Sequence, residues 1–447
     1  MRPVALAVGL ALGCSACTLG PDHQRPRMTL PDRFDADADS AATAAPVDPV
    51  SAWWARFDDP ILAGLVETAV AENQRLAEVR ARIAEARALE RQAASALNPQ
   101  LAYNAAYTRL RASENDAGAV SELNEAGLID QQLDIFETGV EASWEIDLFG
   151  GQRRRIDQAQ ARLRAATWDS RALHLSIAAE VARTYVTLRA AQVRRSTLED
   201  IVEVERETRD LTATRLDSGL APELDVARAE TRLERTKAQV PPARQQVEIA
   251  IFRLSVLTGQ APGALRQDLS VDRAIPMAAS GVPRGQPLAL LDRRPDLRAA
   301  EARLEAATAR VGAEKADLYP RLVLFSTAGL ESTSLSDLFA IASGTFAVGP
   351  SLSLPIFQGG RQRAEIAAAK AGRVGAEAAY RQAVLRALED VEGAYSQVTH
   401  SLAERNQLAL ALDRAERAFD LARAYYRAGL ADLTTVLSAE RDVLETR

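Results

Sequence analysis

The sequence is poor in the residues on which most enzymes and metal proteins rely. It has only three histidines, His23, His174 and His400, far apart along the chain, and two cysteines, Cys14 and Cys17, both near its start. Aromatic residues make up 5% of the chain. Scattered histidines do not form the spaced ligand pairs of a zinc site. A disulfide between two cysteines so close in sequence would constrain little of the fold. We therefore predict no metal site, no catalytic residues and no structural disulfide.

Enzyme signatures and a nucleic-acid surface are missing as well. The chain contains no GxGxxG, P-loop, GxSxG or HExxH pattern. Its net charge is -7, and its arginines are interleaved with glutamates rather than clustered, which argues against nucleic-acid binding. The richness in Ala, Leu, Arg, Glu and Gln instead favours long helices and coiled coils. We predict a protein that is not an enzyme and needs no cofactor.

Long apolar runs are absent beyond the N-terminus, where the sequence indicates a lipoprotein signal. No later run approaches the about 18 apolar residues of a transmembrane helix. The start combines an arginine, the apolar run VALAVGLALG and then CSACTLGPD, with one cysteine as the lipidated first residue of the mature chain. Ser15 and Ala16 are small residues before Cys17, whereas Leu12 fits poorly before Cys14. We predict a diacylglycerol and an N-acyl chain on Cys17, with Cys14 as runner-up; an ordinary cleaved signal is the alternative. Residues 1–16 are then the signal peptide, and 17–56 an extended segment.

The rest of the chain contains one internal duplication. Three blocks recur in the same order: LNPQLAYNAAYTRL with LYPRLVLFSTAGL, IDLFGGQRRRI with LPIFQGGRQRAEI, and SGLAPELDVARAETRL with AGLADLTTVLSAERDV. The period of roughly 210 residues is too long for a solenoid unit, so each half is a large module. We assign 57–258 to the first repeat, 259–286 to an irregular equatorial linker and 287–447 to the second repeat.

Each repeat has the same predicted layout, mainly α with a small β part. A helix enters a two-stranded hairpin, a helix of about 68 residues and roughly 100 Å leaves it, and a shorter helix returns. Long Ala-rich helices need lateral partners, so we expect antiparallel coiled-coil packing. The expected elements are entering helices at 61–97 and 287–318, strands at about 98–110, 138–149, 320–331 and 346–357, long helices from Gln152 and Arg361, and a returning helix at 222–257 bent at Pro241 and Pro242.

The strands alternate between apolar and polar residues. In VEASWEIDLFGG, Trp144 lies on the apolar side, and Glu141, Glu145 and Asp147 lie on the other. A half-buried sheet of a soluble domain shows the same pattern, but about ten residues is also the length of a transmembrane strand. Four strands leave open edges, so a membrane barrel would have to close between chains. We predict that Trp144 faces lipid and that the three acidic residues line the barrel lumen.

Each second strand is expected to pass into a long helix without a loop. Glycines at 150–151 and 359–360 mark the two joints. Their freedom to adopt positive φ allows the chain to change there from β to α. The predicted molecule therefore changes from strands in a membrane to helices in water within a few residues.

Several motifs together resemble the outer membrane efflux proteins of the TolC and OprM type, in the NodT-like lipoprotein branch. They are CTLGPDHQRP, RRPDLRAAEARLEAATARVGAEKADLYPRL, LPIFQGGR and the paired GLA turns, and the resemblance covers nearly all of the chain after the signal. It implies a homotrimer with a 12-stranded β-barrel in the outer membrane and a 12-helix α-barrel across the periplasm. It also implies a passive exit duct for small molecules, working with a periplasmic adaptor protein and an inner-membrane pump. A type I protein secretion duct is the alternative function.

The resemblance also assigns the two hairpin turns to the periplasmic tip, where relatives form a gate. Gly219 and Gly429 mark the turns, and Ser438 stands where relatives carry an aspartate. We expect the tip arginines to form ion pairs with Asp217, Glu223, Asp432 and Glu440, or else to be ordinary solvated charges. The residues assigned to the tip and gate are Arg215, Gly219, Leu220, Arg427, Gly429, Leu430, Ser438 and Arg441.

The alignment of the two repeats also bears on the C-terminus. Arg447 falls over Lys237, so the second repeat lacks a counterpart of 238–258. The comparison therefore predicts a chain that stops short of a final helical piece.

Overall fold

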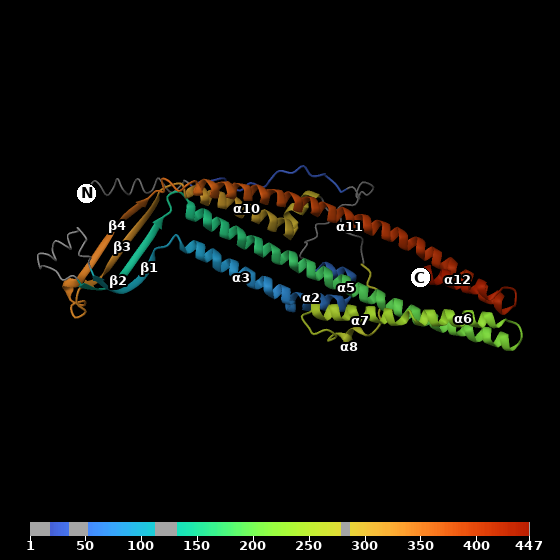
Figure 1. Cartoon of the computed structure of the whole chain (residues 1–447). Helices are drawn as coiled ribbons and strands as arrows, with labels where there is room; N and C mark the ends of the chain where they lie inside the picture. Colours follow the sequence, from blue (N-terminus) through green and yellow to red (C-terminus); the bar gives the residue numbers. More distant parts are fainter. Residues whose placement is uncertain (1–17, 35–51, 112–131, 279–286, 447) are drawn as a thin grey trace. The chain divides into compact units, whose positions relative to one another are not determined.

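The computed structural model describes residues 18–34, 52–111, 132–278 and 287–446. The chain divides into two compact units. Unit 1 comprises Met1–Arg27, Ala81–Thr167 and Ala299–Arg381, and unit 2 comprises Met28–Arg80, Trp168–Arg298 and Gln382–Arg447. Figure 1 shows the order of the elements along the chain. Each unit therefore draws on both sequence repeats, and each is described separately below.

Unit 1 contains a four-stranded antiparallel sheet in the order β1-β2-β3-β4 (Figure 1). β1 spans Gln100–Arg111 and β2 spans Gln132–Ile146, followed by β3 at Arg321–Ser332 and β4 at Gly344–Ser353. The four strands occur close to the predicted ranges, but β2 begins before the expected residue 138, and β4 ends before the expected residue 357. β4 ends early because Pro355 lacks the N–H that a ladder would need. The two repeats thus contribute one hairpin each to a single sheet.

The helical part of unit 1 is packed through small side chains. The entering helix α10, Pro295–Ala316, lies beside the long helix α5, Gly151–Asp217. Their ion pair between Arg164 and Glu305 has an N–O distance of 2.6 Å. Alanine lets two helix backbones approach closely, which accounts for the Ala-rich composition of this region. The buried alanines of α10 and the first part of α5 are Ala161, Ala165, Ala299, Ala302, Ala306, Ala309, Ala313 and Ala316.

Residues 18–34 of the N-terminal segment have no regular secondary structure, as the sequence predicted, whereas the 3-10 helix η2, Trp53–Phe57, begins within the range expected to be extended. Residues 18–27 make specific contacts within unit 1. Arg25 donates two hydrogen bonds to Glu301, at 2.8 and 2.9 Å. Gly20, at φ +100°, passes so close to Gly312 that a β-carbon on Gly20 would lie 2.4 Å from the Gly312 α-carbon. Two glycines at one crossing permit this approach, so the segment has a fixed place on α10.

Unit 2 holds the larger apolar core. It forms where α2, Pro60–Glu72, and α7, Val240–Leu257, pack on the middle of α5. The sequence predicted an irregular linker at 259–286, but this segment includes α8, Arg266–Leu269, whose Leu269 is 1% exposed within the same core. Burying an apolar side chain of this size contributes about 1.5–3 kcal/mol, which accounts for the fixed place of residues 266–269 against this core.

Both entering helices are interrupted, contrary to the prediction of one helix each. In the first repeat the break falls at Asn73, between α2 and α3, Gln74–Ser95. Asn73 donates to the Leu257 carbonyl at 2.8 Å and accepts from the Arg75 amide at 3.0 Å. An asparagine side chain satisfies the backbone groups that a helix break exposes. The second repeat begins with η3, Pro287–Ala289, and α9, Leu290–Arg293, ahead of α10.

The break before α10 explains the RRPD motif. Pro295 disfavours helical backbone at Arg294, which has ψ 121°. Arg294 donates to Asp296 at 2.7 Å and to Asp390 of α11 at 2.9 Å. Although burial acts in the opposite direction, the hydrogen bonds and charge of Arg294 lower the pKa of Asp296. The motif thus ends one helix and ties the start of the next to α11, which spans Arg361–Arg427.

The returning helix of the first repeat is also divided, but not at its prolines. α6 spans Glu223–Lys237, and α7 begins at Val240. Pro241 and Pro242 lie in the first turn of α7, where a missing N–H costs nothing because no intrahelical acceptor exists there. The predicted bend at the prolines is therefore displaced to residues 238–239. In the second repeat α12, Leu433–Thr446, returns along α11. Two short 3-10 helices complete the described elements: η2 at Trp53–Phe57 and η4 at Ile341–Ser343.

Candidate functional site

The register of the sheet separates its residues into a polar and an apolar face. Glu141 lies opposite Ala102 in β1 and Thr327 in β3, and Thr327 lies opposite Ala347 in β4. Residues directly opposite share a face of the sheet, and their sequence neighbours point the other way. Asn104 also donates to Glu141 at 3.3 Å on this face. The polar face thus carries acidic, amide and hydroxyl groups. The other face is mainly apolar, with the polar residues Arg109, Gln132 and Asp134 near the end of β1 and the start of β2.

The apolar face is exposed. The described helices leave Leu101 75%, Phe346 84% and Val348 73% exposed. A soluble sheet buries its apolar face against helices or a second sheet, and an exposed face of this size marks contact with a membrane or a partner. The larger apolar side chains that share this face are Leu101, Tyr103, Tyr107, Phe136, Val140, Trp144, Leu322, Leu324, Leu330, Phe346, Val348 and Leu352.

Of the three predicted lumen residues, two lie on β2 and one does not. Glu141 and Glu145 lie on the polar face of β2, and their position in a lumen stays a prediction. Asp147 lies beyond the end of β2. Its carboxylate accepts from the backbone amides of Gln152 at 3.2 Å and Arg153 at 2.9 Å. Asp147 therefore caps the start of α5, where unpaired amides and the helix dipole favour a negative charge, and it is not a strand residue.

The strand-to-helix joints are not equivalent. In the first repeat only residues 147–150 separate β2 from α5, whereas in the second residues 354–360 separate β4 from α11. The expected absence of a loop is therefore wrong for the second joint. Gly150 has φ +74°, and Gly359 and Gly360 have φ +57° and +89°. The glycines do supply the left-handed backbone that the change from β to α requires.

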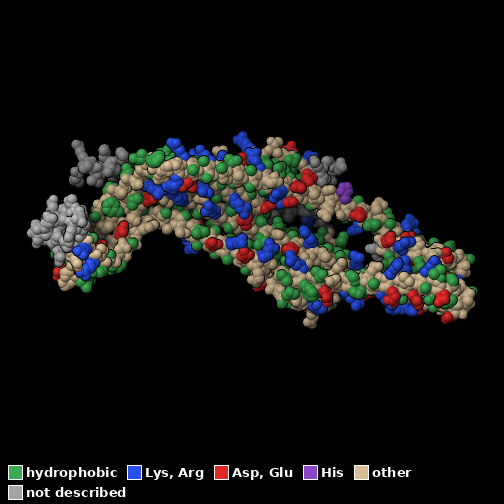
Figure 2. All heavy atoms as spheres, viewed as in Figure 1, with side chains coloured by type: hydrophobic (Ala, Val, Ile, Leu, Met, Phe, Trp, Pro, Cys, Tyr) green, Lys and Arg blue, Asp and Glu red, His purple; other side chains and the backbone are tan. Residues whose placement is uncertain are grey.

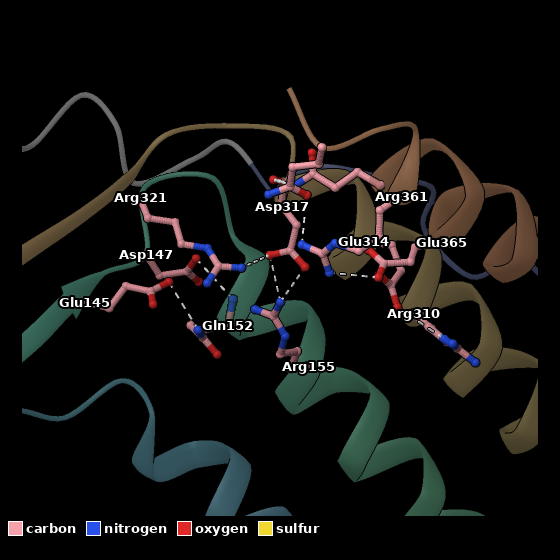
Figure 3. Close-up of polar contacts among 12 residues, drawn as sticks. Glu145, Asp147, Gln152, Arg155, Arg310, Glu314, Asp317, Arg321, Arg361 and Glu365 are labelled. Atoms are coloured by element: carbon pink, nitrogen blue, oxygen red, sulfur yellow. Dashed lines mark hydrogen bonds and ion pairs between the residues drawn. The ribbon is translucent and has the colours of Figure 1, made fainter. Parts of the chain in front are cut away.

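Asp317, between α10 and β3, is the centre of the polar contacts at these joints (Figure 3). Arg155 of α5 donates to both its carboxylate oxygens at 2.8 Å, and Arg321 of β3 donates to Oδ1 at 2.7 Å. Gln362 of α11 donates to its backbone carbonyl. Figure 3 shows the side chains of Arg155 and Arg321 converging on this carboxylate. One aspartate thus links the joints of both repeats within unit 1.

The two hairpin turns of unit 2 have the same geometry. Gly219 and Gly429 have φ +70° and +75°. The amide of Leu220 donates to the Arg215 carbonyl at 2.8 Å, and that of Leu430 donates to the Tyr425 carbonyl at 2.9 Å. This hydrogen bond across six residues, with glycine in the left-handed region, is the Schellman ending of a helix. The duplicated GLA sequences therefore form duplicated turns, each carrying an exposed leucine.

The predicted tip arginines have different environments. Arg215 donates to the Tyr426 carbonyl at 2.8 Å, and its guanidinium lies 4.6 Å from the centre of the Tyr426 ring. Tyr425 occupies in the second turn the place that Arg215 has in the first. Arg427 ends α11, where a cation complements the helix dipole. Ser438 and Arg441 are exposed on α12.

Two of the four acidic residues expected to pair with these arginines, Asp432 and Glu440, have other partners within the chain. Asp432 caps α12, because its Oδ1 accepts from the Thr435 amide at 2.9 Å and from the Thr435 hydroxyl at 2.6 Å. Glu440 forms an ion pair with Arg232 of α6, at 3.2 Å, rather than with Arg441. The expected partnership of Glu440 with the tip arginines is therefore wrong within one chain, since Glu440 points into the protein.

A buried cluster of charges joins the two hairpins. Arg232 donates through Nε to Glu205 of α5 at 2.9 Å and through Nη1 to the Leu437 carbonyl at 3.1 Å. The side chains of Glu205 and Glu440 are 2% and 4% exposed. Burial raises the pKa of Glu440 to about 7, with the charge of Arg232 opposing the rise and that of Glu205 adding to it. Two carboxylates thus share one arginine away from water.

Sequence reasoning missed Glu205, Arg232 and Tyr426 as functional residues. One signal was present: Arg232 lies among Ala229, Leu233 and Thr236, the buried positions of α6. A charge within a buried helical stripe requires a partner in the interior. On the face shown in Figure 2, basic and acidic side chains are intermixed along the surface, and exposed pairs of this kind are weak.

Cys17 and Cys14 lie outside the described residues, and the lipidation prediction remains untested. Within the described part of the chain, none of the helices is both long and apolar enough to cross a membrane.

Comparisons with known proteins agree on one family. The family model described as outer membrane efflux protein matches residues 65–260 and 287–447. A nodulation protein T of Rhizobium leguminosarum bv. viciae is 30% identical over 443 residues, covering 98% of this chain and 87% of that protein. The toluene efflux pump outer membrane protein TtgF of Pseudomonas putida is 29% identical over 457 residues, covering 99% and 92%. The solved structure of the outer-membrane channel OprN superposes with a TM-score of 0.89 at 35% identity, covering 96% and 94%.

The fold has the same parts as this family: long paired helices from two repeats and one hairpin from each repeat in a small antiparallel sheet. The matched segments correspond to the two repeats, and the unmatched residues between them fall in the linker. The resemblance inferred from the sequence motifs is thereby confirmed. The chain belongs to the outer membrane efflux protein family, whose members are channels of the outer membrane.

Proposed function

We propose that this protein is the exit duct of a tripartite efflux system, anchored in the outer membrane and extending into the periplasm. It accepts small molecules from an inner-membrane pump and a periplasmic adaptor protein, and it catalyses no reaction. The observation that supports this most strongly is the sheet of unit 1, with one apolar face left exposed by the described residues. Charged residues on a lipid-facing strand position cost about 2–4 kcal/mol at mid-bilayer for Arg or Lys and about 0–1 kcal/mol near the interfaces. The face with Glu141 and Glu145 therefore points away from lipid, and the charged pair Arg109 and Asp134 of the apolar face lies near the end of β1 and the start of β2, where such charges are tolerated.

The edges of the sheet support closure between chains. Among the described strands β1 pairs only with β2, and β4 pairs only with β3. Unpaired backbone groups at two edges are not tolerated in a bilayer. We infer that three copies close edge to edge into a twelve-stranded barrel, the number that the family resemblance implies. In that barrel the polar face, with Glu141 and Glu145, lines the lumen.

The relatives favour efflux of small molecules over protein secretion. Similar proteins are named for toluene efflux, pyoverdine export and fusaric acid resistance. None of these names assigns a substrate to this chain. A passive duct discriminates little between substrates, because the inner-membrane pump selects them. We infer that small organic molecules are exported, and we retain a type I protein secretion duct as the alternative.

The anchor is proposed from the sequence. Cys17 carries the diacylglycerol and the N-acyl chain, with Cys14 as runner-up. Mass spectrometry of the mature N-terminus tests this proposal. A mature chain that begins at Cys14, or one without a lipid, would contradict the assignment to Cys17.

The duct itself is tested by a matched pair of cysteine variants on adjacent residues of β2. In membranes, Glu141→Cys should react with a water-soluble thiol reagent, and Val140→Cys should be protected. Native mass measurement of the same preparations should give a trimer. The reverse labelling pattern would overturn the assignment of the faces, and a protein that is only monomeric would overturn the duct.

A further inference from the structure

The buried cluster of Glu205, Arg232 and Glu440 has an unbalanced charge. Arg232 directs its Nε at Glu205, 2.9 Å away, and lies 3.2 Å from Glu440. Among the described residues neither oxygen of Glu440 accepts a hydrogen bond, and Glu205 Oε2 also lacks a donor. A buried carboxylate without donors is costly in its charged form and is better tolerated when it holds a proton.

The groups around Glu440 come from every helix packed against it. α5 contributes Glu205 and α6 contributes Arg232, and the charge of Arg423 on α11 also acts on Glu440. Arg423 is itself committed to Glu207 at 3.1 Å. With Arg423 paired to Glu207, Arg232 is the arginine that serves both buried glutamates, and its Nε hydrogen bond goes to Glu205 rather than to Glu440.

The cluster lies where the two sequence repeats meet in unit 2. Glu205 and Arg232 belong to the hairpin of α5 and α6, and Glu440 belongs to the hairpin of α11 and α12. Arg232 also donates to the Leu437 carbonyl on α12, so one side chain holds both hairpins. Any change in the charge of Glu440 therefore acts on the packing of one hairpin against the other.

We propose that Glu440, buried beside Arg232 and Glu205, is a proton-binding site: with its proton bound the two hairpins pack tightly together, and when the proton is lost their packing loosens. The inference rests on the proposed duct function, because it makes the turns at Gly219 and Gly429 sensitive to the pH around the tip. When Glu440 releases its proton to water, a second negative charge remains in a site that offers one nearby arginine. The α12 hairpin then packs less tightly, and the tip conducts more readily.

The direction follows from the raised pKa of Glu440, about 7 against the ordinary 4.5. The folded protein binds this proton more tightly than the unfolded chain, so the contribution of the site is complete below the ordinary value. It declines as the pH rises through about 7.

The test uses the full-length trimer. Its basal conductance in planar bilayers and the amide exchange of residues 433–446, corrected for the intrinsic pH dependence of exchange, are measured from about pH 5.5 to 8.5. In the wild type, protection of α12 should fall and conductance should rise around pH 7. Glu440→Gln, which carries no titratable proton, should give flat profiles.

Two further variants make the test specific. Glu205→Gln removes the neighbouring charge and frees Arg232 for Glu440, so the midpoint should move down by about one pH unit or more. Glu203→Gln is the matched control, because Glu203 is 61% exposed on the same helix and its ion pair is with Arg206. That control should follow the wild-type profile.

Two outcomes would overturn the proposal: a pH-independent wild type, or a Glu440→Gln profile that still changes like the wild type. Failure of the proposed duct would look different. In that case no variant would conduct or form a trimer at any pH, although amide exchange could still report the proton site. Native mass measurement of each variant confirms that the conductance compared is that of an assembled protein.

Discussion

The guanidinium of Arg215 lies 4.6 Å from the centre of the Tyr426 ring and donates a 2.8 Å hydrogen bond to the carbonyl of the same residue. Arg215 belongs to the end of α5 and Tyr426 to the end of α11, so this contact joins the corresponding helix ends of the two repeats. Tyr426 is buried beside Leu433 and Val436 of α12. The arginine therefore links the second turn to the first, and no acidic side chain of the described residues pairs with it.

Arg215→Ala should weaken the association of the two hairpins. Loss of a charged hydrogen bond and of a cation–π contact is expected to lower the free energy of unfolding by about 1–3 kcal/mol. Denaturant unfolding in detergent and amide exchange of residues 423–446 measure the effect. The matched control is Arg206→Ala, since Arg206 is 44% exposed and pairs within its own helix. A control that destabilises as much as Arg215→Ala would contradict the role of Tyr426.

Asp317→Ala should loosen the strand-to-helix joints of unit 1. The substitution removes a carboxylate that holds Arg155 and Arg321, and partly exposed pairs of this kind contribute about 0–1 kcal/mol each. We expect a loss of about 1–2 kcal/mol because two arginines lose their partner together. Thermal unfolding of the purified protein checks this. Glu365→Ala serves as control because its pair with Arg361, shown in Figure 3, lies on one helix and is exposed. Equal losses in the two variants would remove the special role of Asp317.

Gly312→Ala should displace the N-terminal segment from α10. A β-carbon at this position would lie 2.7 Å from the Leu19 carbonyl oxygen, and backbone atoms cannot yield as a flexible side chain does. Overpacking of this kind costs about 1–3 kcal/mol. Limited proteolysis should therefore cut near residues 18–27 sooner than in the wild type.

Gly372→Ala is the matched control for that experiment. Gly372 lies in a helix as Gly312 does, but nothing lies within 4 Å of a β-carbon there. Alanine is favoured over glycine inside a helix by about 1 kcal/mol, so this variant should be as stable as the wild type or more so. If both variants expose the segment equally, the close crossing of Gly20 and Gly312 is not what holds it.

Asp432→Ala should fray the first turn of α12 at neutral pH. Hydrogen bonds from the side chain and the backbone of Thr435 lower the pKa of Asp432 below its usual 3.8. For a depressed pKa the stabilisation is present above the unfolded value and is lost as the pH falls through the lower folded value. In the wild type, amide protection of residues 433–437 should therefore decline below about pH 3.8.

Asp432→Asn separates capping from charge. Asparagine is a good N-cap but does not titrate, so protection in this variant should persist at neutral pH and show no step near the aspartate pKa. A step of unchanged size would assign the acid sensitivity to another group. Glu440 is distinguishable because its contribution changes in the opposite direction and at a higher pH.

Several parts of this protein were determined by the sequence alone. The duplication was visible because both repeats keep the same order of blocks, and the GLA turns form the same Schellman ending at Gly219 and Gly429. The long helices were predictable since composition and periodicity are local properties. The alternation in β2 predicted the separation of Trp144 from Glu141, because side chains alternate across any strand.

Contacts distant in the sequence decided the rest. The sequence placed Asp147 on a strand because it continues the alternation, but the free amides of α5 use its carboxylate instead. Asn73 looked like an ordinary helix residue, yet the Leu257 carbonyl, 184 positions away, gives it a partner at the break. Val323 and Phe325 obscured the alternation of β3, and only pairing with β2 settled which face they share.

The candidate site was predictable where it depends on local backbone geometry and not where it depends on desolvation. The turns at Gly219 and Gly429 could be predicted because a helix ending of this kind needs a residue with positive φ, which glycine adopts readily. The sequence predicts Glu440 as a partner of the tip arginines or a solvated charge, because nothing near it in the sequence shows that α5 and α6 cover it. Its burial beside Glu205 and Arg232 arises only when the hairpins of both repeats pack together. Water is then excluded, and the cost of charge without hydrogen bonds makes an ordinary glutamate a proton-binding group.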